Sequence, residues 1–242
     1  FANAIFFLMG LVLPRLWDNL TRARRFRALR KFWKGIEDGA LLVTCIHFSP
    51  VPDGEELTPK LLGFGDATAM KEITEMLTSR ILSTEPVNVR EYYEGKLLTE
   101  DRHNNLICVG GGLNNEITTE MLYSIGVPRH FFDREGSGKE SKVVRSEDNT
   151  WSVKPRVVNG MVIEDVGIIV KSRHPAYADK SILIFAGAYS HGTLAATRFA
   201  TSEKLLRPWE NILDAERFEI VIKAIPDGYE VAHISVEWAS AF

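Results

Sequence analysis

Only two cysteines occur among the 242 residues, Cys45 and Cys108, and both lie within apolar runs. No CxxC pair or Cys/His cluster is present, so we expect neither a disulfide framework nor a zinc site, and we predict no metal and no cofactor. Buried thiols in a reducing compartment are the expected state of both cysteines. An excess of positive charge is also missing, because the net charge is −3. This composition does not favour general binding to nucleic acid.

Residues 1–14 contain no charged side chain. Spanning a bilayer takes roughly 20 apolar residues, and this run is shorter. We expect it to be the end of a transmembrane helix that starts before Phe1. The alternative is a short apolar helix that packs on the core or on a partner subunit. A cleaved signal peptide fits poorly, because its charges precede its apolar run.

Basic residues follow this apolar run with little opposing acidic charge: Arg15, Arg22, Arg24, Arg25, Arg27, Arg30, Lys31 and Lys34. Basic flanks favour the cytoplasmic side of a membrane and attract anionic lipid headgroups. The same stretch has an apolar stripe at helical steps of three and four: Leu16, Leu20, Ala23, Phe26, Leu29, Trp33 and Ile36. Residues 1–38 are therefore predicted to form a transmembrane end and a basic amphipathic stalk helix. The stalk would lie near the headgroups or pair with neighbouring stalks, and residues 39–242 would form a cytoplasmic domain at the inner or plasma membrane.

The remaining chain alternates between apolar runs and helical patterns. Strands are predicted at 41–48, 87–92, 106–109, 167–171 and 181–186, and helices at 66–81, 115–124 and 192–201. Such βα units usually pair in parallel. A polar, turn-rich middle part, with short strands around Asn159-Gly160, predicts an antiparallel β-flap inserted in the sheet, and a hairpin over 218–238 closes the chain. The predicted fold class is α/β, with a Rossmann-like, mostly parallel sheet.

Three glycines follow the predicted strand 106–109 and precede a predicted helix: Gly110, Gly111 and Gly112. Glycine allows a sharp turn and lets backbone N–H groups approach an anion without a Cβ atom in the way. The N-terminus of the following helix adds a partial positive charge. Side chains expected to add ligand contacts here are those of Asn114, Asn115 and Thr118.

A second glycine-containing turn follows the predicted strand 181–186. It comprises Gly187, Tyr189, Ser190, His191, Gly192 and Thr193. In a parallel sheet both turns emerge at the carboxyl ends of strands, where ligands of open α/β sheets bind. We therefore predict that the two turns form one site for a nucleotide or oligonucleotide. His47, at the end of the first predicted strand, either reaches this site or forms a local hydrogen bond.

The alternative is that these glycines only satisfy turn geometry and helix packing. Neither turn matches GxxxxGK[ST] or GxGxxG, which argues against an ATPase and a dinucleotide dehydrogenase. We predict no catalytic residue, because adjacent loop residues such as Ser190 and His191 seldom face each other productively. An aspartate at Gly111 or at Gly192 is expected to weaken ligand binding without unfolding the protein.

The GGG turn after one strand and the GxxxxGT turn after another resemble the Rossmann-like SLOG superfamily, the group that contains the LOG phosphoribohydrolases, over residues 106–199. The resemblance implies a nucleotide sensor joined to membrane segments, of the kind found in bacterial defence. The enzymes of that group have GGxGTxxE, with a glutamate placed for hydrolysis. The corresponding tract here is Gly192-Thr193-Leu194-Ala195-Ala196, with alanine where the acid is expected, so the resemblance implies binding more than hydrolysis.

The leading hypothesis is a membrane-anchored effector or receptor whose cytosolic domain binds the ligand and changes the packing of the attached helices. This requires ligand affinity to differ between two states of the assembly. A single span cannot form a pore alone, so a homo-oligomer is expected if the output is permeability. The competing hypotheses are a membrane-tethered hydrolase that processes a nucleotide or nucleoside, and a structural scaffold without a ligand.

Overall fold

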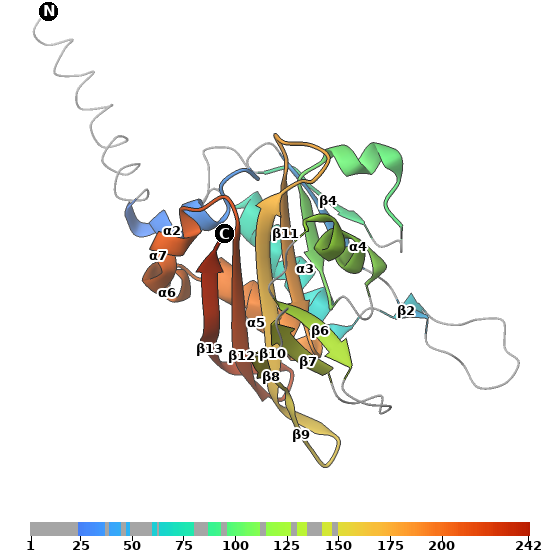
Figure 1. The fold of residues 1–242 in the computed structure, drawn as a ribbon, viewed down its shortest axis with the longest axis vertical. Helices are drawn as coiled ribbons and strands as arrows, with labels where there is room; N and C mark the ends of the chain where they lie inside the picture. Colours follow the sequence, from blue (N-terminus) through green and yellow to red (C-terminus); the bar gives the residue numbers. More distant parts are fainter. Residues whose placement is uncertain are drawn as a thin grey trace, which may run out of the picture.

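The computed structural model describes residues 24–36, 39–44, 47–48, 60–61, 63–79, 87–92, 96–111, 115–126, 130–134, 142–146 and 150–242. Within these residues an eight-stranded sheet forms the centre of the molecule, and helices cover both of its faces (Figure 1). Two smaller sheets accompany it. One pairs β2 (His47–Phe48) with β3 (Lys60–Leu61), and the other contains β6 (His130–Arg134), β7 (Lys142–Ser146) and β8 (Ser152–Val153).

One half of the central sheet is parallel. Its strands lie in the order β4 (Val89–Tyr92), β1 (Ala40–Thr44), β5 (Leu106–Val109) and β11 (Ser181–Gly187). The chain therefore places β4 on one side of β1 and β5 on the other. Such a reversal of strand order leaves a crevice at the carboxyl ends of the strands, where open α/β sheets bind ligands.

The other half of the sheet is antiparallel. β10 (Met161–Arg173) pairs with β11 on one side and with β12 (Phe218–Asp227) on the other, and β13 (Glu230–Ala241) forms the edge. β9 (Arg156–Val158) adds a short hairpin to the start of β10. The α/β class is confirmed, and the mixed sheet is consistent with a Rossmann-like arrangement.

The two faces of the sheet bury different sets of helices. α3 (Phe64–Thr78) and α5 (Ser190–Thr201) pack on one face, and α4 (Glu116–Ser124) packs on the opposite face (Figure 1). Five shorter helices complete the described part: α2 (Arg27–Phe32), η1 (Thr99–His103), α6 (Glu203–Leu206), η2 (Arg207–Trp209) and α7 (Glu210–Leu213). The apolar run of β5 explains this layering, because Ile107 contacts the α3 and α5 side while Cys108 contacts the α4 side.

Cys108 is fully buried, as expected from the apolar run around it. Burial, together with the smaller effect of the nearby Glu120 carboxylate, raises the pKa of its thiol to about 12. The thiol therefore stays protonated at neutral pH and acts as a small apolar side chain. Cys45 lies outside the described residues.

The prediction of a separate stalk that extends to residue 38 is wrong for its last part. α2 (Arg27–Phe32) and the turn after it pack against the domain, and Phe32, Trp33 and Ile36 are all buried in the core beside α5 and the sheet. The Trp33 indole N–H donates a hydrogen bond of 2.9 Å to the carbonyl of Ala200. Phe32 also stacks on Phe185 of β11, with ring centroids 6.2 Å apart. These side chains gain more apolar burial here than they would at a lipid headgroup.

No helix among the described residues is long and apolar enough to cross a membrane. The apolar run 1–14, on which the transmembrane prediction rests, lies outside those residues.

The docking of α2 gives a direct stability prediction. Trp33→Ala should lower the free energy of unfolding by about 3–5 kcal/mol, because it removes a fully buried indole and leaves the Ala200 carbonyl without its donor. Urea unfolding followed by circular dichroism measures the change. Lys34→Ala, at an exposed position next to it, should shift the unfolding free energy by less than about 0.5 kcal/mol. Equal stability of the two variants would contradict the core position of Trp33.

Candidate functional site

The two glycine turns predicted from the sequence lie together in the structure. They follow neighbouring parallel strands, β5 and β11, in the sheet. The contact between them is so close that a Cβ atom at Gly111 would overlap the carbonyl oxygen of Gly187. Gly110, before this contact, has φ +110, a conformation that favours glycine.

A cleft of about 350 Å³ opens where these turns meet. Among the predicted ligand residues, those that line it are Gly111, Gly187, Tyr189, Ser190, His191 and Thr193. The lining also includes Gly63, Asp66 and Val162, which the sequence analysis did not select. The volume lies at the lower end of the range of about 300–1,000 Å³ that is usual for small-molecule sites.

The N-termini of α3 and α5 meet at this cleft. A Cβ atom at Gly65 would overlap the Ser190 carbonyl, so glycine permits the first turns of the two helices to touch. Asp66, in the first turn of α3, places its carboxylate beside the backbone of Gly63 and Gly110. An acidic side chain at this position interacts favourably with the helix dipole.

A buried carboxylate occupies the space before the first turn of α5. Asp165 of β10 is fully buried and accepts hydrogen bonds from the N–H groups of Val166 (2.8 Å), Tyr189 (3.1 Å) and Gly192 (2.5 Å). Two of these donors belong to the N-terminus of α5, where the sequence predicted contacts with a phosphate. Asp165 therefore takes a large part of the anion-binding capacity of this helix.

Burial raises the pKa of Asp165 to about 6, against the lowering effect of its amide hydrogen bonds and of nearby His191. The ordinary value is 3.8. Between the two values, the folded protein holds a proton that the unfolded chain has released. The contribution of Asp165 to the free energy of unfolding therefore falls as the pH rises through this interval, and this contribution levels off above about pH 6.

Two other predicted ligand residues have structural roles. Asn115 caps α4: its side-chain oxygen accepts from the N–H groups of Ile117 and Thr118, and its side-chain nitrogen donates 3.0 Å to the carbonyl of Val109. Thr118 belongs to α4 itself, and its side chain is fully buried. Gly112 and Asn114 lie outside the described residues, as does the side chain of His47.

The closing hairpin borders the cleft. The ring nitrogen Nε2 of His191 lies 2.9 Å from the carbonyl of Gly228 in the hairpin turn, and because a carbonyl only accepts, Nε2 is the protonated nitrogen. Tyr229 in the same turn packs against Phe64 at the start of α3, with the rings tilted and their centroids 5.0 Å apart. The hairpin thus contacts both helices whose N-termini line the cleft.

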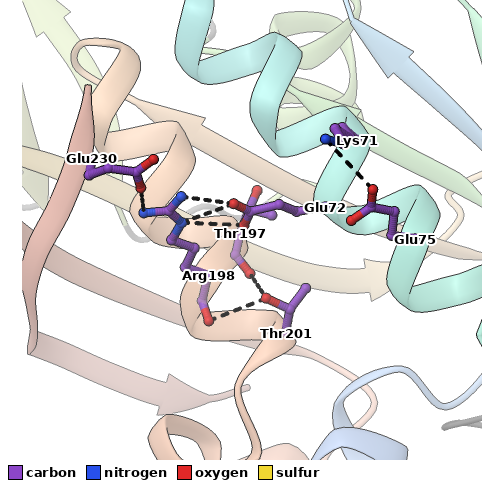
Figure 2. A network of polar contacts seen from close by, with 7 residues as sticks. All are labelled: Lys71, Glu72, Glu75, Thr197, Arg198, Thr201 and Glu230. Carbon is purple, nitrogen blue, oxygen red and sulfur yellow. Dashed lines mark hydrogen bonds and ion pairs between the residues drawn. The ribbon is translucent and has the colours of Figure 1, made fainter.

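An ion-pair network strengthens the same connection farther along α5. Figure 2 shows Arg198 of α5 between Glu72 of α3 and Glu230 of β13. The guanidinium Nε and one terminal nitrogen lie 3.0 and 2.9 Å from the same Glu72 oxygen. Because Arg198 and Glu72 are each about three-quarters buried, this pair is better shielded from solvent than an ordinary surface salt bridge.

The described residues that line the cleft include few charged groups. These residues provide one carboxylate and one imidazole, and neither a lysine nor an arginine. No group of three metal-ligating side chains occurs among the described residues. The protonated nitrogen of His191 faces Gly228, so in the neutral imidazole the lone pair is on Nδ1.

The tight glycine contacts overturn one prediction from the sequence. A Cβ atom at Gly111 or at Gly192 would overlap a backbone carbonyl, that of Gly187 or of Val166. Aspartate at either position is therefore expected to disrupt the fold itself, since backbone cannot move aside as a flexible side chain can. These two glycines satisfy packing requirements, as the alternative interpretation proposed.

No protein-family model matches the chain, and a comparison with characterised proteins finds no significant relative.

The position of Asp165 gives a pH-dependent prediction. Asp165→Asn should be less stable than wild type at every pH, because its amide nitrogen must face one of the N–H donors and leaves it unpaired, at about 1–3 kcal/mol. The deficit should grow by on the order of 1 kcal/mol when the pH is lowered from about 7 to about 5, since only the wild type gains a proton on this carboxylate. Urea unfolding at the two pH values measures this. The exposed control Asp179→Asn should show no such change, and a constant deficit for Asp165→Asn would contradict the raised pKa.

Proposed function

We propose that this chain is the ligand-binding domain of a receptor or effector, and that its ligand is a nucleoside or a mononucleotide. The observation that carries the proposal is the convergence of the first turns of α3 and α5 with Gly111 and Gly187 at one cleft. This cleft lies at the carboxyl ends of parallel strands, where α/β sheets bind such ligands. The resemblance to the SLOG superfamily supports the same ligand class.

The charges around the cleft restrict the class of ligand that it would bind. Asp165 already accepts hydrogen bonds from two N–H groups at the N-terminus of α5, and the described residues that line the cleft include no lysine or arginine. A polyphosphate would therefore find few partners there. The carboxylate of Asp66 suits the hydroxyl groups of a ribose, since a carboxylate accepts hydrogen bonds from a diol. The cleft volume suits one nucleoside unit better than an oligonucleotide.

A hydrolase acting on a nucleotide or nucleoside is the second candidate function. The presence of a carboxylate, a hydroxyl and an imidazole in one cleft favours it: Asp66, Ser190 and His191. Against it, Ala196 stands where the enzymes of the SLOG group have their glutamate. Binding without turnover is the better-supported proposal.

Membrane anchoring and homo-oligomerisation complete the proposal. Residues 1–14 remain the candidate anchor, and the domain would lie on the cytoplasmic side of the inner or plasma membrane. The basic stretch after that segment would contact anionic headgroups through its exposed side chains, which include Arg24, Arg25 and Arg27. Gly35 lies beside Ser181 at the start of β11, whereas the cleft lies at the end of that strand. The cleft would then lie roughly 20 Å farther from the anchor than the start of β11 does.

The ligand proposal is tested with Asp66→Asn. Wild type should be stabilised in a thermal-shift assay by adenosine, guanosine or their monophosphates, and less by the matching 2′,3′-dideoxynucleoside. Asp66→Asn should bind the ribose-containing ligand at least about tenfold more weakly and should no longer distinguish it from the dideoxy compound. The exposed control Asp179→Asn should behave as wild type. Chromatography of the ligand after incubation distinguishes a receptor from a hydrolase.

Absence of a shift with every nucleoside and mononucleotide would reject the ligand class. A shift that is unchanged in Asp66→Asn would place the ligand elsewhere on the domain.

The anchor has its own test. Protein with residues 1–14 should remain in the membrane pellet after carbonate extraction, whereas a chain that begins at Arg24 should be soluble and should keep the thermal stability of the domain. The second chain starts at Arg24 because α2 and Trp33 belong to the core, so a start near Gly39 would remove part of the fold. Recovery of the longer protein in the carbonate supernatant would reject the membrane anchor.

A further inference from the structure

The last strand of the chain forms one long edge of the central sheet. Among the described strands, β13 pairs only with β12 and is the terminal strand of the sheet (Figure 1). It is 12 residues long, and none of its residues is buried. The opposite edge strand, β4, has 4 residues. Proteins usually shorten or block an edge strand, because its free N–H and C=O groups pair readily with another strand.

The hydrogen-bond pattern identifies which groups face outward. The Phe242 N–H donates a hydrogen bond of 3.2 Å to the carbonyl of Arg217, the residue before β12. Since antiparallel neighbours alternate between bonded and non-bonded pairs, the N–H groups of Ala239 and Ala241 point away from β12. The carbonyl of Ala241 accepts a hydrogen bond of 3.0 Å from the hydroxyl of Ser240, a local side-chain contact and not one from a neighbouring strand.

The side chains of this strand do not block the edge. Residues 230–241, all of them described, include no proline, lysine or arginine. Half-buried apolar side chains lie on both faces of the strand: Val231, Ile234, Val236 and Ala239 toward the α3 and α5 side, and Trp238 toward the α4 side. A strand added beside β13 would cover the exposed parts of these side chains on both faces of the sheet.

We propose that a second copy of this chain pairs with β13, antiparallel, so that the two sheets join across a two-fold axis. Pairing around Ser235 would place the exposed His233 of each copy opposite the exposed Glu237 of the other, a self-complementary arrangement that a two-fold axis requires. This deepens the homo-oligomer part of the proposed function and rests on that part alone. It replaces the expected stalk contact, because Phe32 and Trp33 are buried within the subunit.

Hydrogen exchange of the C-terminal segment tests the pairing directly. The amides of Trp238 and Ser240 bond to β12 in a monomer and in a pair alike, whereas that of Ala239, opposite Val231 of the second copy, gains a partner only in the pair. At high concentration, peptides covering β13 should show slow exchange at the Ala239 amide. Dilution should release that amide while the inward ones stay protected. Fast exchange of the Ala239 amide at every concentration would overturn the proposal.

A substitution separates assembly from folding. Ala239→Pro removes an outward N–H and keeps the inward bonds, and proline is tolerated on the open side of an edge strand. It should weaken self-association at least about tenfold, measured by light scattering of the whole chain in detergent, whereas Ala239→Ser should not. If Ala239→Pro lowers the melting temperature, the concentration dependence of exchange at the wild-type Ala239 amide is the deciding measurement. Unchanged association in a folded Ala239→Pro variant would overturn the proposal.

The outcome is independent of the ligand. A monomeric proline variant that still shows the nucleoside thermal shift would support edge pairing together with the binding proposal. A monomeric variant from a protein that binds no nucleoside would support edge pairing and reject the ligand. A wild-type protein that is monomeric at all accessible concentrations would overturn edge pairing, whatever its ligand.

Discussion

The carboxylate of Asp165 connects the antiparallel half of the central sheet to α5, the helix that follows the parallel strand β11. It belongs to β10, the first antiparallel strand beside the parallel half of the sheet, and it accepts hydrogen bonds from the N–H groups of Tyr189 and Gly192 at the start of α5. The backbone of α5 can approach the sheet this closely because Gly192 has no Cβ to overlap the Val166 carbonyl. An unpaired buried carboxylate would cost several kcal/mol, so the position of α5 and the ionisation of Asp165 depend on each other.

Three strands of the parallel half, β1, β5 and β11, are predictable from the sequence because they are buried on both faces. Continuous apolar runs such as 106–109 are typical of strands that are buried on both faces of a sheet. Adjacent parallel strands bring the turns that follow them to the same end of the sheet. The meeting of Gly111 and Gly187 follows from these two facts. β10 is harder to predict, because the acidic pair at 164–165 divides its apolar pattern. It remains one strand of 13 residues since Asp165 is satisfied by backbone N–H groups.

Other features depend on contacts that no local pattern specifies. Asp66 and Asp165 are ordinary acids in the sequence, and only the packing of α3 and α5 places one at the cleft and the other beneath a helix N-terminus. The aromatic residues of α2 show a similar ambiguity. An apolar stripe with Phe and Trp between arginines suits a lipid headgroup region and a protein core equally well by composition, and the choice depends on Phe185, Phe218 and Ala200, more than 150 positions away.

The closing hairpin both contacts the border of the cleft and forms an edge of the central sheet. Its turn contacts His191 and Phe64 beside the cleft, and its second strand is that edge of the sheet. A displacement of the turn by an occupant of the cleft would tilt the strand that a neighbour must match, and a neighbour would in the same way bias the turn. Thermodynamic reciprocity then makes the two effects equal in free energy. Such coupling would need no moving domain, because the 12-residue strand β13 and the turn before it connect the cleft to the sheet edge.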